Sequence, residues 1–173
     1  CFSMNILIIN HEFPPIGGGG GIFTSLLARG LSESGFNVFV LIPSSLSETV
    51  SITETLTVIK VKSLRFNRTS ISNFGMLNFI LTFSLIINKI IKKYNINIVN
   101  SHFIHTSGLA DFLSFHKIPS VISPLGADIY DPTRYCKIRN FMNFAAKKIF
   151  KKNNKIVLSS SDMLNRTIGL FPE

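Results

Sequence analysis

The chain has 173 residues, 46% hydrophobic and 16% charged, a balance that excludes intrinsic disorder and suffices for one domain with its own core. Its two cysteines, Cys1 and Cys136, are too few for a disulfide framework, so we expect a protein of a reducing compartment. The net charge of +9 favours an anionic partner but does not choose between nucleic acid, a membrane surface and a phosphorylated ligand.

Short apolar runs alternate with longer segments of helical period along the chain. The apolar runs predict strands at residues 5–10, 38–42, 57–61, 96–100, 120–123 and 155–159. The segments between them predict helices at residues 22–34, 72–94, 107–116, 131–152 and 160–170. This alternation predicts one α/β domain over residues 1–173, with a doubly wound, Rossmann-like parallel sheet and helices on both faces.

Individual residues support the positions of the helices. Gly35 provides a C-terminal stop for the first helix, and Asp131 followed by Pro132 forms a helix start. One of three serines at residues 159–161 is expected to cap the last helix. The first helix is expected to bury one apolar stripe: Ile22, Phe23, Leu26, Leu27 and Leu31.

Targeting signals are weak in this sequence. Residues 1–9 carry no basic stretch, and their apolar run is too short for a signal peptide. The longest apolar stretch, residues 74–87, is also shorter than the roughly 20 residues that a spanning helix needs. We therefore interpret this stretch as part of a buried helix and expect a cytoplasmic protein.

A run of five glycines lies between the first predicted strand and the first helix. In doubly wound sheets, ligands bind beyond the carboxyl ends of the strands, where this run is expected to lie. Glycines let the backbone approach a ligand closely, and the free N–H groups of the following helix favour an anion. A flexible turn is the alternative. The candidate anion-binding residues are Gly17, Gly18, Gly19 and Gly20.

Two common nucleotide-binding classes are disfavoured. The dinucleotide fingerprint G-x-G-x-x-G fails in every register because residues 22–24 contain no glycine, and residues 43–45 offer no acid for a ribose. A P-loop is excluded because Gly-Lys-Ser/Thr occurs nowhere in the chain.

Four stretches, in chain order, resemble motifs of glycosyltransferase family 4. They read F-P-P-I-G-G-G with L-A-R-G-L and G-F-N-V-F-V within residues 13–40, N-I-V-N-S-H-F-I-H-T-S-G at 97–108, I-P-S-V-I-S-P-L-G-A-D-I-Y at 118–130 and K-I-V-L-S-S-S at 155–161. The resemblance covers nearly the whole chain. It implies the GT-B architecture, two Rossmann-like domains across a cleft, of which this chain is the N-terminal, acceptor-side half without the C-terminal nucleotide-sugar domain.

The resemblance also implies a reaction: retaining transfer of a sugar from a nucleotide-diphosphate donor to an envelope glycan or glycolipid acceptor. The amides of Gly18 and Gly19 are then expected to stabilise the leaving diphosphate, with no metal and no cofactor. The catalytic residues stay unknown, and the isolated half is expected to be inactive. The alternative is a non-catalytic basic module that binds anionic lipid or a phosphorylated ligand. Nucleic acid is disfavoured as a partner, because only residues 65–68 interleave basic and aromatic side chains.

Six further residues are candidates for the cleft: His11, Glu12, His102, His105, Gly126 and Asp128. The first two either form an acid–base pair, hydrogen-bond the acceptor or anchor the loop; neighbours at a strand end are expected to point in different directions. The later histidines either line the cleft or satisfy local backbone groups, and they lack a third metal ligand. The aspartate either faces the acceptor or caps a turn. Leu125 stands where the family often has a histidine that contacts the transferred sugar, which puts that contact in doubt.

Basic residues form two further candidate sites. The candidates for a membrane patch are Arg65, Arg68, Lys147, Lys148, Lys151 and Lys152. Each basic residue near an anionic lipid surface contributes about 1 kcal/mol to binding. The lysines alone favour a solvated helix end. The resemblance to the family, many of whose members are peripheral enzymes that glycosylate lipid-linked acceptors, implies attachment to a membrane, and we expect it at the inner face of the plasma membrane.

Overall fold

The computed structural model describes residues 4–15, 17–63, 73–130, 139–152 and 155–170. Within them, the strands are β1 (Asn5–Ile9), β2 (Asn37–Ser44), β3 (Glu48–Ser51), β4 (Leu56–Lys62), β5 (Ile98–His102), β6 (Ser120–Ser123) and β7 (Lys155–Ile156). The helices are α1 (Gly19–Glu33), α2 (Asn73–Lys93), the π-helix η1 (Phe103–Gly108), α3 (Leu109–Leu113), α4 (Ala127–Tyr130), α5 (Arg139–Lys152) and α6 (Ser161–Leu170).

All the described strands belong to one sheet, in the order β3-β4-β2-β1-β5-β6-β7. Every neighbouring pair is parallel except β3 and β4, which are antiparallel. From β1 the chain first builds the sheet toward β2 and β4, and it then returns to add β5, β6 and β7 on the other side. The predicted doubly wound sheet is confirmed, and its switch point lies between β1 and β5, where such folds bind ligands.

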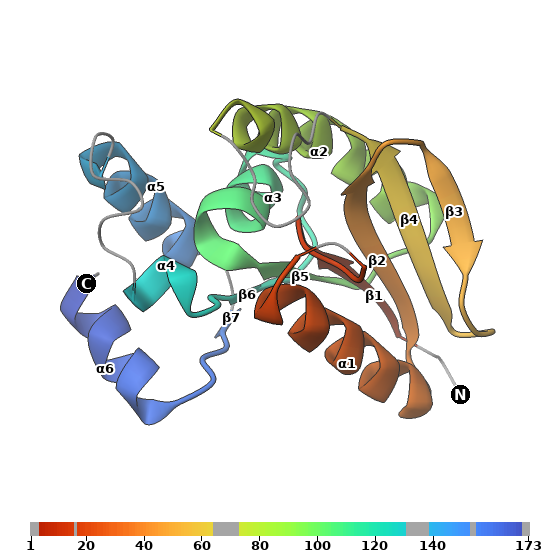
Figure 1. Cartoon of the computed structure of the whole chain (residues 1–173), viewed down its shortest axis with the longest axis horizontal. Helices are drawn as coiled ribbons and strands as arrows, with labels where there is room; N and C mark the ends of the chain where they lie inside the picture. Colours follow the sequence, from red (N-terminus) through yellow and green to blue (C-terminus); the bar gives the residue numbers. More distant parts are fainter. Residues whose placement is uncertain (1–3, 16, 64–72, 131–138, 153–154, 171–173) are drawn as a thin grey trace.

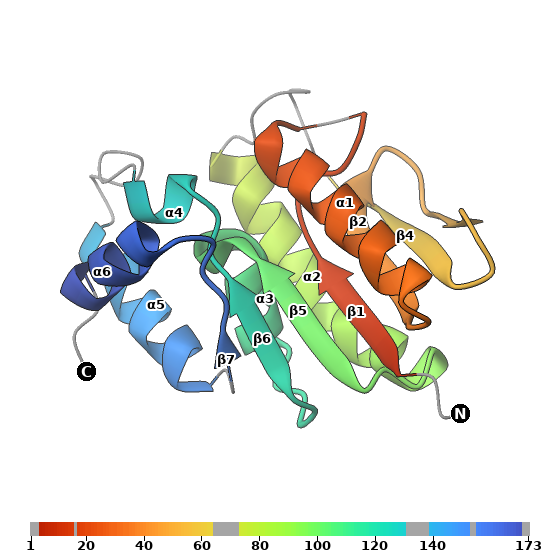
Figure 2. The same cartoon turned by 90° about the horizontal axis from the view of Figure 1, so that it is seen from below.

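The central strand β1 is buried on both faces because its side chains alternate between two cores. Ile6 and Ile8 pack with Ala28 of α1, whereas Leu7 and Ile9 belong to the core formed with α2. Figures 1 and 2 show α1 and α2 on opposite faces of the sheet. The continuous apolar run of this strand is thus explained by helices that cover it from both sides.

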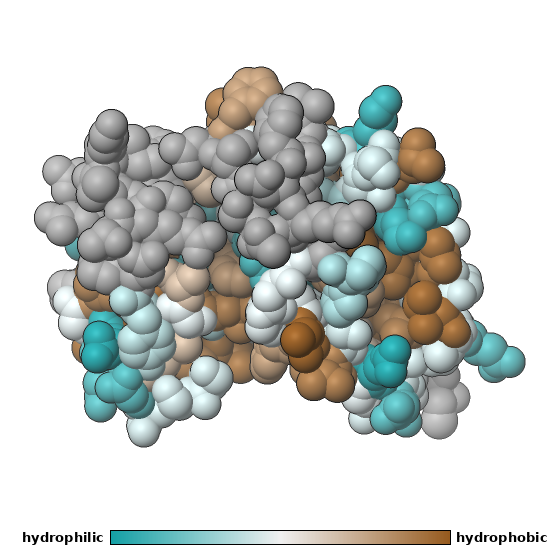
Figure 3. Space-filling model, in the orientation of Figure 1, coloured by the Kyte–Doolittle hydropathy of each residue, from teal (hydrophilic) through white to brown (hydrophobic). Residues whose placement is uncertain are grey.

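The helix α1 turns a different face to the sheet than its apolar pattern predicts. Its fully buried positions are small: Gly21, Thr24 and Ala28. Leu27 and Leu31 pack against the core beside them. The other three residues of the predicted stripe are exposed: Ile22 (58%), Phe23 (40%) and Leu26 (65%). Figure 3 shows hydrophobic surface, in brown, where α1 lies in Figure 1. The prediction was wrong for these three residues because small side chains let the helix approach the sheet closely, and hydrophobicity alone does not show this.

The helix ends follow the predicted local chemistry. Gly35 adopts a φ of 90°, its N–H donates to the Ser32 carbonyl at 3.0 Å, and the Phe36 N–H donates to the Leu31 carbonyl at 3.2 Å. This is a Schellman motif, so the predicted stop of α1 is confirmed. Ser160 caps α6, because its hydroxyl accepts the Met163 N–H at 3.1 Å.

Other elements differ from the prediction. The antiparallel strand β3 and the short helix α4 were not predicted, and the predicted helix at 107–116 is replaced by η1 and α3. The strand β7 is shorter than expected, although the Val157 N–H still donates to the Ile122 carbonyl at 2.9 Å. The predicted helix start at Asp131 and Pro132 lies outside the described residues, and the described part of that helix is α5.

The helix α2 combines a buried face with an apolar exposed face. Phe79, Phe83 and Ile87 are fully buried in the core, whereas Leu81 and Leu85 are exposed. By length and composition alone, the segment Phe74–Lys93 is the one helix of the described residues that could cross a membrane, and 39% of its most apolar window is buried. Its packing against the sheet agrees with the prediction of a core helix.

Candidate functional site

Buried polar side chains gather at the carboxyl ends of β1 and β5. They come from the two residues after β1 and from α1, β5 and η1: Asn10, His11, Thr24, Ser101, His102, His105, Thr106 and Ser107. Burying a polar group costs free energy unless the group is hydrogen-bonded, so a core that served only stability would carry few of them. Their concentration beside the switch point of the sheet marks this end as the candidate site.

The glycine loop enters α1 earlier than predicted. Gly17 has a φ of 108°, and the helix begins at Gly19, so that three glycines form its first turn. The N-cap residue is Gly18, which has no side chain to cap the following amides, and no acidic residue lies in the first turn. The Glu12 carboxylate bonds to the N–H of Gly18 itself. The N–H groups of Gly19 and Gly20 have no acceptor among the described residues. The loop therefore presents an uncapped helix N-terminus, which favours an anion.

Four of the five glycines have two different roles. A Cβ atom on Gly17 would lie 2.6 Å from the Glu12 Cβ, and one on Gly20 would lie 2.6 Å from the Phe103 Cζ. A Cβ atom on Gly18 or Gly19 would meet nothing within 4 Å. Gly17 and Gly20 are thus required by packing, whereas Gly18 and Gly19 border open space where a ligand can approach the backbone.

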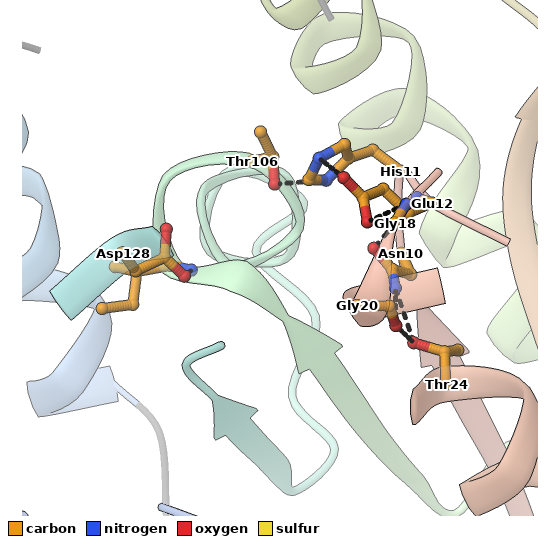
Figure 4. Close-up of polar contacts among 9 residues, drawn as sticks. Asn10, His11, Glu12, Gly18, Gly20, Thr24, Thr106 and Asp128 are labelled. Atoms are coloured by element: carbon orange, nitrogen blue, oxygen red, sulfur yellow. Dashed lines mark hydrogen bonds and ion pairs between the residues drawn. The ribbon is translucent and has the colours of Figure 1, made fainter. Parts of the chain in front are cut away.

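His11 and Glu12 lie side by side next to this loop, as Figure 4 shows. Their closest polar atoms, the His11 Nε2 and the Glu12 Oε1, are 3.7 Å apart. The Glu12 Oε2 also accepts the Gly18 N–H at 3.2 Å, and the His11 Nδ1 shares a hydrogen bond of 2.9 Å with the Thr106 hydroxyl. The expectation that the two side chains diverge was wrong, because β1 ends at Ile9 and the strand alternation no longer applies to them.

His102 ends β5 and is fully buried against α1. Its Nδ1 shares a hydrogen bond of 2.7 Å with the Thr24 hydroxyl, and its ring lies 5.6 Å from the Phe23 ring. Burial lowers the pKa of His102 to about 4, so this histidine is neutral at neutral pH. His105, within η1, is also buried, with 4% of its surface exposed.

Asp128 supports the site from a distance. Its Oδ2 accepts the Ile104 N–H at 2.8 Å, which ties α4 to the start of η1. In Figure 4, the π-helix η1 lies between Asp128 and the group around His11 and Glu12. Gly126 is exposed just before α4, and Leu125 is partly buried. The predicted cleft residues therefore do not form one cluster: His105 lies within η1, and Asp128 lies across η1 from His11 and Glu12.

Several contributors to the site were not predicted, among them Asn10, Thr24 and Phe103. Phe103 has a φ of 68°, an uncommon backbone conformation for a side chain of this size, and its ring lies 4.6 Å from the His11 ring. The polar Asn10 directly after an apolar strand was an available signal, as was a threonine on the helix that follows the glycines. The position of the Phe103 ring has no such local signal.

The predicted basic patches lie elsewhere. Lys147, Lys148 and Lys151 of α5 border a groove of about 810 Å³ between α5, β7 and α6. The other residues that line the groove are Thr167 and six apolar residues: Phe144, Phe150, Ile156, Leu158, Leu164 and Ile168. None of the described residues that line it is acidic. Arg65 and Arg68 lie outside the described residues, as does the side chain of Lys152. Among the described residues, no group of three or more potential metal ligands comes together.

Comparisons with known proteins identify the family and the fold. The model of the family described as "Glycosyl transferase 4-like" matches residues 16–161. A search of curated proteins returns no match. A sucrose-phosphate synthase from Thermosynechococcus elongatus is similar over 95% of this chain and 44% of its own, with 13% identity and a TM-score of 0.76.

Two further solved structures share the fold. A glycosyltransferase from Rickettsia africae is similar over 97% of this chain and 40% of its own, with 18% identity and a TM-score of 0.52. A structure described as trehalose-6-phosphate from E. coli bound with UDP-2-fluoro glucose is similar over 96% and 43%, with 9% identity and a TM-score of 0.52. At these identities the similarity shows the fold alone, and this chain spans less than half the length of each of the three.

Proposed function

Because the chain belongs to the glycosyl transferase 4-like family, we propose that it is the acceptor-side half of a GT-B enzyme. This enzyme moves a sugar, with retention, from a nucleotide-diphosphate donor to an envelope glycan or glycolipid. The uncapped N-terminus of α1 at the switch point of the sheet is the observation that carries the proposal. The UDP-2-fluoro glucose bound in the E. coli neighbour supports a donor of this class.

On this proposal, α1 stabilises the charge that develops on the leaving diphosphate. The N-terminus of a helix carries a partial positive charge of about half an elementary charge, and its amides are fixed in place before the reaction. The Gly18 N–H already donates to the Glu12 carboxylate. We therefore assign the diphosphate to the amides of Gly19 and Gly20, with the open space at Gly18 and Gly19 admitting the phosphate oxygens.

The other half of the enzyme supplies most of the nucleotide site in this proposal. The chain alone is then expected to bind a nucleoside diphosphate weakly and to transfer no sugar. Glu12 is partly exposed beside the loop, with 16% of its side chain accessible, and it is the residue that we assign to the acceptor hydroxyl. His11 is almost fully buried, and its Nε2 lies 3.7 Å from the Oε1 of this carboxylate.

Substituting Gly18 and Gly19 together by valine is expected to weaken UDP binding at least tenfold. The new side chains enter the open space that the diphosphate needs, and the fold accommodates them because nothing lies within 4 Å of either Cβ position. Titration with UDP, followed through the amide NMR signals of Gly19 and Gly20, measures both the affinity and the place of binding.

The matched control is Gly30→Val, which adds the same side chain to open space on the same helix. It should leave UDP affinity within a factor of two. Wild-type signals of Gly19 and Gly20 that do not move with UDP, or equal affinities of the double variant and the control, would contradict the proposal. Binding of inorganic pyrophosphate with no preference for UDP would favour the non-catalytic phosphate-binding module.

We also propose that the groove beside α5 attaches the enzyme to the inner face of the plasma membrane. Lys147, Lys148 and Lys151 line the groove together with apolar side chains, and none of its described lining residues is acidic. Basic and apolar side chains in one place suit a surface of anionic lipid. Replacing these three lysines by glutamate is expected to reduce sedimentation with vesicles of phosphatidylglycerol and phosphatidylcholine at least tenfold.

The control for the membrane proposal is the triple glutamate variant at Lys89, Lys92 and Lys93, three exposed lysines at the end of α2. It changes the net charge equally but leaves the groove intact, so it should retain most of the binding. An equal loss in both variants would show that net charge alone drives attachment.

A further inference from the structure

The hydroxyl of Thr24 joins three segments that are far apart in the sequence. Its Oγ1 lies 2.5 Å from the Asn10 Nδ2, 2.7 Å from the His102 Nδ1 and 2.8 Å from the Gly20 carbonyl oxygen. Asn10 follows β1, His102 ends β5, and Gly20 belongs to the first turn of α1. The Asn10, Thr24 and His102 side chains are fully buried, so water does not share these bonds.

The hydrogen-bonding capacity of the Thr24 hydroxyl accounts for all three contacts. A hydroxyl has one proton to donate and two lone pairs that accept. The Thr24 hydroxyl donates to the Gly20 carbonyl, and it accepts the Asn10 amide hydrogen. The remaining lone pair can accept only from a protonated His102 Nδ1. This hydrogen-bond network therefore selects the Nδ1–H tautomer of His102 and leaves no unused donor or acceptor on Thr24.

The network also reaches the residues on both sides of the glycine loop. The Asn10 Nδ2 lies 3.3 Å from the same Gly20 carbonyl, and the Asn10 Oδ1 accepts the Glu12 N–H at 3.0 Å. One buried hydroxyl thus ties the first turn of α1 to the ends of two central strands and, through Asn10, to the backbone of Glu12.

We propose that Thr24 is a positioning residue that fixes the direction in which the Gly19 and Gly20 amides face the cleft. The inference rests on the proposed function of these amides and adds the group that holds them. The geometry distinguishes this role from simple packing. Thr24 shares its buried face of α1 with Gly21 and Ala28, where an apolar residue would fill the space without any buried hydrogen bonds.

The test compares Thr24→Val, which keeps the shape and removes the hydroxyl, with Thr24→Ser, which keeps the hydroxyl. Amide hydrogen exchange, measured without ligand, reports how stable the first turn of α1 is. The amides to follow are those of Gly21 and Ile22, whose N–H groups donate to the Gly18 carbonyl. We expect these two amides to exchange at least tenfold faster in the valine variant, relative to β1 and β5 amides of the same sample. The serine variant should stay within threefold of the wild type.

UDP affinity is measured on the same variants and should fall about tenfold with valine and recover with serine. Equal exchange and equal affinity in the two variants would overturn the positioning role. If the wild-type chain binds no UDP, the proposed function fails, while the exchange data still decide whether the hydroxyl holds the turn.

A second pair of variants tests the network if Thr24→Val does not fold. His102→Asn places an amide nitrogen where Nδ1 stands and preserves a donor to Thr24, whereas His102→Leu removes it. The leucine variant is expected to show the faster exchange at Gly21 and Ile22, and the asparagine variant is not. The same exchange in both would also overturn the proposal.

Discussion

Replacing Asp111 by alanine is expected to lower the free energy of unfolding by about 1–3 kcal/mol, the range for leaving a buried hydrogen-bonding group without its partner. The Asp111 carboxylate bonds directly to the His116 Nε2, and the two side chains are 0% and 2% exposed. Alanine leaves the imidazole buried without this partner, so the desolvation cost of the histidine is no longer offset.

The pair lies away from the glycine loop, because Asp111 belongs to α3 and His116 precedes the start of β6. The loss of stability should therefore leave UDP affinity unchanged in buffer where the variant is folded. Urea unfolding measures the change. Glu48→Ala is the control, since it removes the same charge from an exposed pair with Lys60 and should cost about 0–1 kcal/mol. Equal losses in both variants would show that the buried pair contributes no more than a surface pair.

The fold was predictable because buried parallel strands leave a strong local signal. The apolar run of β1 indicates a strand covered on both faces, and alternation with helical segments then implies the topology. The strand β3 left no such signal. Its sequence E-T-V-S is mostly exposed and is held in the sheet by its pairing with β4.

The place of the candidate site was predictable, but its internal contacts were not. A topological rule put the glycine loop at the carboxyl ends of the strands, and this needs no knowledge of partners. The bond between Thr24 and His102 joins residues 78 positions apart, and the ring of Phe103, whose backbone is left-handed, packs against Gly20. Such contacts arise only when α1 and β5 are already assembled, so no local pattern encodes them.

A second large effect concerns the pH dependence of stability, which we expect to be controlled in part by His102. Burial lowers the pKa of its imidazole to about 4 in the folded protein, whereas an unfolded histidine titrates near 6.5. Between these values the unfolded chain binds the additional proton, so unfolding becomes more favourable as pH falls. The contribution of His102 is fully present above about pH 6.5 and is lost progressively down to about pH 4. A difference of about two and a half pKa units corresponds to roughly 3 kcal/mol.

Comparison with His102→Asn isolates this contribution from the other titrating groups. Asparagine retains the hydrogen bond to Thr24 but takes up no proton, and all the other titratable residues are the same in both proteins. Between pH 7 and pH 4, the free energy of unfolding of the wild type should fall about 3 kcal/mol further than that of the variant. Parallel curves would mean that the imidazole is protonated without leaving its place beside α1. The same result would remove the argument that a neutral, Nδ1-protonated His102 closes the network behind the glycine loop.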